Sequence, residues 1–118
     1  MLNFPSSVRI FICTQPTDMR KSFDGLSMLA EYVVGADPTS GHLFVFVNKC
    51  GDKLKILYWC GDGFAIWYRR LEKGTFRLPA SESSTLEVNA TDLAMILEGI
   101  DLSSIRRRKR FSLPVTST

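Results

Sequence analysis

Acidic side chains next to basic ones are the first candidates for chemistry in this sequence of 118 residues. Asp18 and Asp24 flank Arg20 and Lys21 within one short stretch. A carboxylate beside a cation can take part in proton transfer, but this spacing is far more typical of a helix cap and a surface ion pair. We therefore predict no catalytic residue in this stretch.

The other residue types that serve catalysis or metal binding are sparse. Three cysteines and one histidine (Cys13, Cys50, Cys60 and His42) show no CxxC or paired spacing, whereas a zinc site needs three or four ligands. Phosphate-binding glycine loops and GxSxG are absent, and no predicted strand interior carries the acids of a two-metal nuclease. We expect a non-enzymatic protein without cofactor or metal, a metal-dependent nuclease being the less favoured alternative.

A run of five cations at residues 106–110 is the clearest functional feature. It holds five of the fifteen basic residues and accounts for the whole net charge of +3. Adjacent cations repel one another unless a polyanion lies nearby, so the run favours contact with DNA. Phosphate contacts of this kind make binding steeply salt-dependent and position a protein without reading sequence. An exposed solubilising terminus is the alternative interpretation.

The cysteine usage and the apolar segments predict the compartment. Unpaired cysteines are typical of a reducing environment, and residues 1–7 lack the basic start and apolar run of a signal peptide. No apolar stretch approaches the roughly 20 residues that cross a bilayer. We expect a cytoplasmic protein with no membrane contact.

These candidates must be positioned by a sheet whose centre is residues 41–77. The segments HLFVFV, KLKILYW, FAIWYRRL and TFRL read as four strands, because they are rich in β-branched and aromatic residues and are separated by glycine-containing turns. An antiparallel meander is the simplest arrangement. Residues 8–13 and 86–88 are further strand candidates, which gives a sheet of about five to six strands.

The alternation of side chains predicts how this sheet is used. Residues 43–47 are apolar on both faces, so this strand should be the most buried. Lys53 and Lys55 share one face of the next strand, while Arg69 and Arg70 end the strand after it. The result would be an apolar sheet with a basic rim that could meet phosphate. Alternatively, these cations only solvate the strand ends.

Two helices complete the predicted domain. One lies between a cap at Thr17 or Asp18 and a stop at Gly35, and its regular part could begin only near Ser22 because Gly25 weakens it. The other follows a cap at Thr91. We predict one α+β domain over residues 1–104, with one or both helices on one face of the sheet, and a basic tail over 105–118. Free strand edges leave a homodimer open.

Several stretches together resemble a known family. In order and spacing they are similar to the small Orf2-like (TnpB) accessory proteins of the insertion sequence 66 family of transposable elements, from about Val8 to Phe111. This TnpB is distinct from the longer RNA-guided nuclease of the same name. The stretches are residues 18–26, 41–46, 52–59, 63–64, 70–76 and 97–101.

The resemblance implies a bacterial mobile-element protein that assists transposition beside a separate transposase, with no agreed catalytic residue or cofactor. Our leading hypothesis is a factor that binds DNA, such as the element's ends, and bridges to the transposase. The alternative is a pure protein-interaction module that docks on the transposase without DNA contact. The candidate nucleic-acid-binding residues are Arg20, Lys21, Lys53, Lys55, Arg69, Arg70, Lys73, Arg106, Arg107, Arg108, Lys109 and Arg110.

Overall fold

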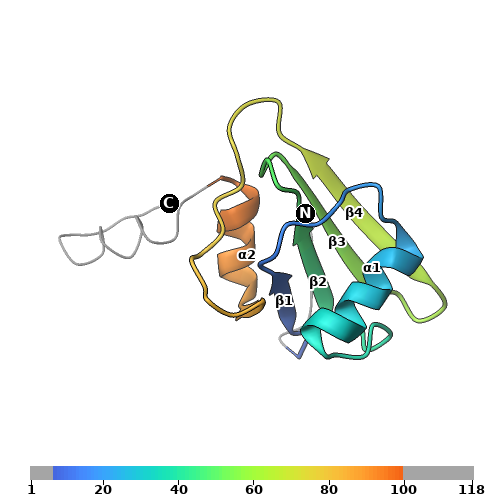
Figure 1. The fold of residues 1–118 in the computed structure, drawn as a ribbon. Helices are drawn as coiled ribbons and strands as arrows, with labels where there is room; N and C mark the ends of the chain where they lie inside the picture. Colours follow the sequence, from blue (N-terminus) through green and yellow to red (C-terminus); the bar gives the residue numbers. More distant parts are fainter. Residues whose placement is uncertain (1–6, 100–118) are drawn as a thin grey trace.

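A sheet of five strands between two helices forms the protein in a computed structural model that describes residues 7–99 (Figure 1). The predicted tail, with its five candidate cations at 106–110, lies outside the described residues. The strands are β1 (Ile10–Cys13), β2 (Leu43–Val47), β3 (Lys53–Trp59), β4 (Phe64–Arg70) and β5 (Thr85–Val88), and the helices are α1 (Phe23–Leu29), continued by η1 (Ala30–Val34), and α2 (Ala90–Leu97).

The strand order is β4-β3-β2-β1-β5, and the sheet is mixed. Consecutive strands β2, β3 and β4 pair antiparallel, as does β5 with β1, whereas β1 and β2 are parallel neighbours. The parallel pair follows from the helix between them, because a crossover returns the chain to the same end of the sheet. The α+β class is confirmed, but the sheet is not purely antiparallel.

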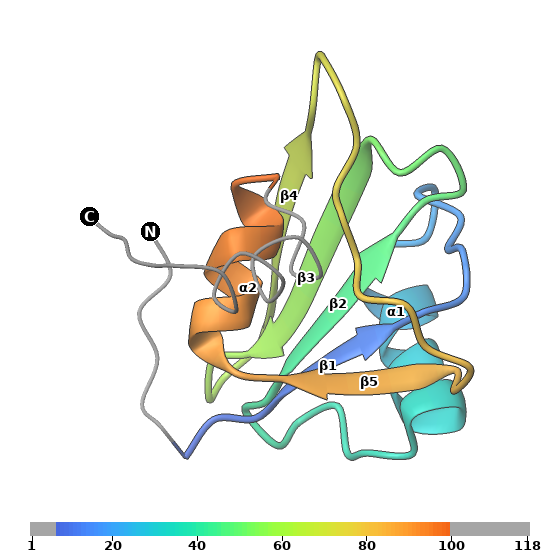
Figure 2. The same cartoon turned by 90° about the vertical axis from the view of Figure 1, so that its left-hand side faces the viewer.

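The sheet has an apolar layer on each face. Leu43, Val45 and Val47 pack with the buried side chains of α2 on one face. Phe44 and Phe46 pack with Leu26 of α1 on the other. All five residues of β2 are buried, so the prediction that this strand is the most enclosed is confirmed. The helices therefore cover opposite faces rather than one face, because β2 and β3 need apolar cover on both (Figure 2).

The helix ends differ in part from the sequence prediction. Helix α1 begins at Phe23 after Ser22 and continues as a wider π-helical turn to Gly35, whose left-handed φ of 77° ends it. Helix α2 is capped by Asn89 instead of Thr91, since the Asn89 side chain accepts a 2.7 Å hydrogen bond from the Asp92 amide. Within residues 7–99 neither helix has the length and apolar content to cross a membrane.

The predicted fourth strand of the meander is wrong. Residues 71–84 form a loop, in which Phe76 is buried in the α2-side core. The Phe76 amide donates a 2.8 Å hydrogen bond to the Gly51 carbonyl, and the Leu71 amide donates a 2.7 Å bond to the Asp52 carbonyl. The aromatic residue that suggested a strand thus anchors this loop onto the β2–β3 turn.

If Phe76 anchors the loop, Phe76→Ala should lower the free energy of unfolding by about 3–5 kcal/mol, since it leaves a cavity in the core. Urea denaturation followed by tryptophan fluorescence measures this. Phe23→Ala is the matched control, because Phe23 is 45% exposed against 5% for Phe76. Equal losses for the two variants would contradict the assigned role of Phe76.

Candidate nucleic-acid interface

Three loops meet at one end of the sheet. The loop after β1 (residues 14–22) and the turn after β2 (residues 48–52) leave adjacent parallel strands at the same end. The loop after β4 joins them there, because Arg70 at the end of β4 pairs with Lys53 at the start of β3. Figure 2 shows the loops after β1 and β2 side by side and the loop after β4 rising above the sheet.

Most of the described cations gather around these loops. Residues 7–99 contain ten basic and eleven acidic side chains, so this part of the chain carries no net positive charge. Eight of the ten cations nevertheless lie here: the buried Lys55 and seven others that form the basic end. The basic end consists of Arg20, Lys21, Lys49, Lys53, Arg70, Lys73 and Arg77.

Most cations of the basic end are not ion-paired with an acidic side chain. Within the described residues the basic end contains two salt bridges, Arg20 with Asp18 and Arg70 with Glu72. The other five cations have no acidic partner there. The opposite end of the sheet carries Asp37 and Asp62 in its loops. The cations are therefore concentrated at one end of the strands, whereas acidic residues occur at both ends.

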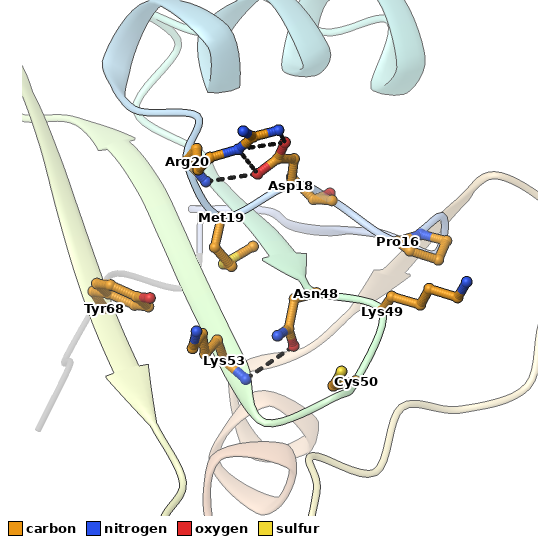
Figure 3. A pocket seen from close by; sticks show the side chains of 10 residues that line it. Pro16, Asp18, Met19, Arg20, Asn48, Lys49, Cys50, Lys53 and Tyr68 are labelled. Carbon is orange, nitrogen blue, oxygen red and sulfur yellow. Dashed lines mark hydrogen bonds and ion pairs between the residues drawn. The ribbon is translucent and has the colours of Figure 1, made fainter.

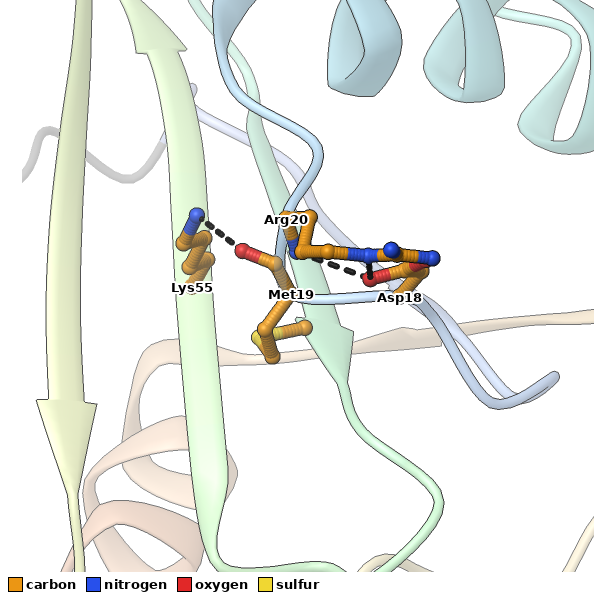
Figure 4. A network of polar contacts seen from close by, with 4 residues as sticks. All are labelled: Asp18, Met19, Arg20 and Lys55. Atoms are coloured by element: carbon orange, nitrogen blue, oxygen red, sulfur yellow. Dashed lines mark hydrogen bonds and ion pairs between the residues drawn. The ribbon is translucent and has the colours of Figure 1, made fainter.

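Lys55 lies beneath the basic end and fixes its shape. Its side chain is on the face predicted from the alternation of β3, but the residue is only 8% exposed. The ammonium donates a 2.8 Å hydrogen bond to the Met19 carbonyl (Figure 4). It donates a second 2.8 Å bond to the Lys21 carbonyl and lies 4.8 Å from the centroid of the Tyr68 ring. Lys55 thus ties the loop before α1 to the sheet and is not presented to a partner.

Arg69 also has a partner within the fold. It lies on the α2 face of β4, and its guanidinium donates a 2.8 Å hydrogen bond to the carbonyl of Leu97, the last residue of α2. A cation at this position satisfies a terminal carbonyl and interacts favourably with the helix dipole. The structure therefore places Arg69 on the opposite face of the sheet from Lys53 and Arg70.

Asp18 and Arg20 form a compact planar pair in the loop after β1. The Asp18 carboxylate accepts hydrogen bonds from Nε, the terminal nitrogen and the backbone amide of Arg20, at 2.7–3.1 Å (Figure 4). These bonds, foremost the one from the Arg20 side chain, lower the pKa of Asp18 to about 2. Asp18 thus shapes the turn before α1 instead of capping the helix.

The turn after β2 is held equally firmly. The Asn48 side chain donates a 2.8 Å hydrogen bond to the Asp52 carboxylate and accepts a 3.0 Å bond from the Lys53 amide. The bond from Asn48 also lowers the pKa of Asp52 below its usual value. Lys49 therefore projects from a rigid turn, and Lys53 begins β3 immediately beside it.

An open pocket of about 580 Å³ lies between these two loops. Met19 and Pro16 provide apolar surface, while Lys53 and Lys49 lie on the opposite side (Figure 3). The hydroxyl of Tyr68 points into the pocket from β4. The remaining lining residues are Thr17, Asp18, Arg20, Asn48 and Cys50.

The structure brings together five of the seven candidate cations that it describes: Arg20, Lys21, Lys53, Arg70 and Lys73. Sequence reasoning missed Lys49, Arg77 and the pocket residue Tyr68. Lys49 precedes the turn glycine Gly51, and Arg77 directly follows Phe76. Their closeness depends on the contact of Phe76 with the β2–β3 turn.

No metal-binding group is evident in the described part of the chain. No three His, Cys, Asp or Glu side chains among residues 7–99 are placed to share an ion. The three cysteines are free; Cys13 is buried, whereas Cys50 and Cys60 are exposed. His42 lies at the opposite end of the sheet, where Nδ1 accepts a 2.9 Å hydrogen bond from the Arg9 amide.

If Lys55 holds the loop before α1, Lys55→Met should lower the free energy of unfolding by about 2–4 kcal/mol, because two carbonyls lose a charged donor. Chemical denaturation measures the change. Lys53→Met, two residues away on the same face, is the control and should change stability by about 0.5 kcal/mol or less. A neutral effect of Lys55→Met would show that its hydrogen bonds do not stabilise the loop.

The Asp18–Arg20 pair predicts an unusual titration. The Asp18 carboxyl should titrate near pH 2 in NMR spectra, below the ordinary value of 3.8. Since the folded pKa is the lower one, the pair's stabilising effect is present above pH 3.8 and is lost as the pH falls toward 2. Arg20→Ala should raise the midpoint, and an unchanged midpoint would refute the pair in solution.

Comparison with known proteins places the chain in a family. The family model described as IS66 Orf2 like protein matches residues 8–107. Uncharacterized protein y4hO of Sinorhizobium fredii (strain NBRC 101917 / NGR234) is 35% identical over 101 residues, covering 86% of this chain and 88% of the relative. Uncharacterized protein y4jC of the same strain is 32% identical over 108 residues, covering 92% of each.

No solved structure matches this chain. The match over residues 8–107 confirms the resemblance that the sequence motifs carry. The chain belongs to the IS66 Orf2-like (TnpB) family of insertion-sequence proteins.

Proposed function

We propose that this protein is a non-enzymatic accessory factor that assists transposition of its insertion sequence by binding DNA through the basic end. The observation that carries the proposal is the gathering of five cations without acidic partners at one end of a part of the chain that has no net positive charge. Family membership supports the link to an insertion sequence.

Electrostatics favours a polyanion over a small anion as the partner. Four of the five cations come from three loops and the fifth, Lys53, from the start of β3, so they offer a spread of charge and not a single chelating site. A DNA backbone presents phosphates at regular spacing and releases bound counterions when cations contact it. Such contacts would orient the protein on the element's DNA without reading its sequence.

The transposase is the second partner in this proposal. Phe23, Met28 and Tyr32 are 45%, 57% and 75% exposed on α1 and η1, on the face of the sheet that α2 does not cover. Of the aromatic residues of β3 and β4, by comparison, Tyr68 alone is a large exposed side chain. Exposed aromatic and methionine side chains are enriched at protein interfaces. A factor with DNA at one end and the transposase on α1 could bridge the two.

The DNA-binding proposal is tested with the full-length protein and a labelled duplex in a series of salt concentrations. Replacing Lys21, Lys73 and Arg77 with Gln should make the log–log salt slope shallower by about 3 and weaken binding, if each contacts one phosphate. These side chains are exposed, so their loss should leave folding intact.

Arg9→Gln is the matched control, because Arg9 lies at the opposite end of the sheet beside Glu87. Its salt slope should equal that of the unmodified protein. A variant with Gln at all five positions 106–110 separates the tail from the folded domain. Loss of all binding in that variant, with the triple variant unaffected, would contradict a role for the basic end. Absence of DNA binding altogether would favour docking on the transposase alone.

A further inference from the structure

The pocket between the loops after β1 and β2 has features that phosphate contact alone does not require. It combines apolar side chains, a hydroxyl and two lysines in one concave space. We propose that this pocket takes one unpaired nucleotide of the bound DNA; this inference rests on the proposed DNA-binding function. It adds a preference for unpaired over paired DNA to that function.

The size of the pocket suits this ligand. Its volume of about 580 Å³ lies within the range of 300–1,000 Å³ that is usual for small-ligand sites, and it is a shallow depression that opens widely to solvent. A base inside a duplex is covered by its neighbours and its partner strand. Extruding it costs a few kcal/mol, whereas a base that is already unpaired can enter without that cost.

The lining divides into a part for the phosphate and a part for the base. Lys49 and Lys53 come from the turn after β2 and the start of β3, and neither has an acidic partner in the described residues. In Figure 3 Lys53 lies across from Met19, whereas Lys49 lies near Pro16 at the other side of the pocket and points away from Lys53. Either lysine can therefore bind a phosphate, Lys53 being the one nearer to Met19. Met19 and Pro16 give the base an apolar surface.

Tyr68 gives the pocket a polar group aimed inward. Its ring lies 4.8 Å from the Lys55 ammonium, which is in turn bound to the Met19 carbonyl. This chain of contacts holds the Tyr68 ring and the Met19 backbone in a fixed relation, so the pocket is formed before a ligand arrives. The Tyr68 hydroxyl, directed into the pocket, can hydrogen-bond to the base or the sugar.

The lining residues should bind the four bases with similar affinity. The Asn48 side chain, which could read a base edge, already donates to Asp52 and accepts from Lys53. The Asp18 carboxylate is likewise occupied by Arg20. The Thr17 hydroxyl donates to the Gln15 carbonyl. Apolar contact, the Tyr68 hydroxyl and the Cys50 thiol remain, and these discriminate weakly among the four bases. The pocket should thus recognise that a nucleotide is unpaired, with little regard to which base it carries.

Three duplexes of equal paired length test the proposal with the full-length protein. One is blunt, one carries a three-nucleotide single-stranded overhang, and one carries an overhang of three abasic sites with the same phosphates. The abasic overhang matches the charge, so any difference between the two overhangs reports on the bases. We expect about tenfold tighter binding to the overhang that has bases.

Two substitutions locate the effect. Met19→Ala removes apolar surface, and Tyr68→Phe removes only the hydroxyl while retaining the ring beside Lys55. Each should reduce the preference for bases over abasic sites, with little change in blunt-duplex affinity. Tyr32→Phe is the matched control, because Tyr32 is 75% exposed on η1 and does not line the pocket.

The outcomes separate this inference from the proposed function. Equal affinity for the two overhangs, with salt-dependent binding to all three duplexes, would overturn the nucleotide pocket and leave the DNA-binding function standing. A preference that survives both Met19→Ala and Tyr68→Phe would place the nucleotide elsewhere and also overturn the inference. Absence of binding to any of the three duplexes would overturn both proposals.

Discussion

The buried ammonium of Lys55 is the interaction on which the candidate interface depends. A charged group with little exposure needs partners, and Lys55 finds them in two main-chain carbonyls of the segment that leads into α1 and in the ring of Tyr68. This one side chain joins β3 to the segment that leads into α1 and to the edge strand β4. The loop after β1 therefore stands beside the β2–β3 turn at a fixed distance, and the pocket and the surrounding cations take their positions from that arrangement.

At this end of the sheet, the acidic side chains are bound to neighbours while most of the cations are not. The acidic residues of segments 14–21, 48–53 and 70–77 are each bound to a neighbour: Asp18 to Arg20, Asp52 to Asn48, and Glu72 to Arg70. These bonds stiffen the loops and leave the remaining cations without acidic partners in the described residues. The field of such an arrangement attracts polyanions even though the described part of the chain has slightly more acidic than basic residues.

Local pattern was enough to predict the strands β1 to β5, the alternation of their faces and the two helices, because strand and helix periodicity reflect which side chains are buried. It did not reveal the parallel pairing of β1 with β2 or the opposite placement of the helices, since both depend on contacts between distant segments. The predicted strand around Phe76 was wrong for a related reason. A single buried aromatic residue in a loop has the same local sequence pattern as part of a strand. Among the candidate site residues, Lys55 and Arg69 could not be told from Lys53 and Arg70 by type or spacing. Only the carbonyls of Met19, Lys21 and Leu97, brought near by the fold, distinguish them.

We propose that the surface that meets DNA is the end of the sheet formed by residues 14–21, 48–53 and 70–77. Backbone amide NMR spectra of the full-length protein, recorded during a titration with a short duplex, test it most directly. We expect the largest shifts in these three segments, with residues 35–42 and 60–63 at the opposite end unchanged. Shifts confined to residues 100–118, or largest at the opposite end, would contradict it.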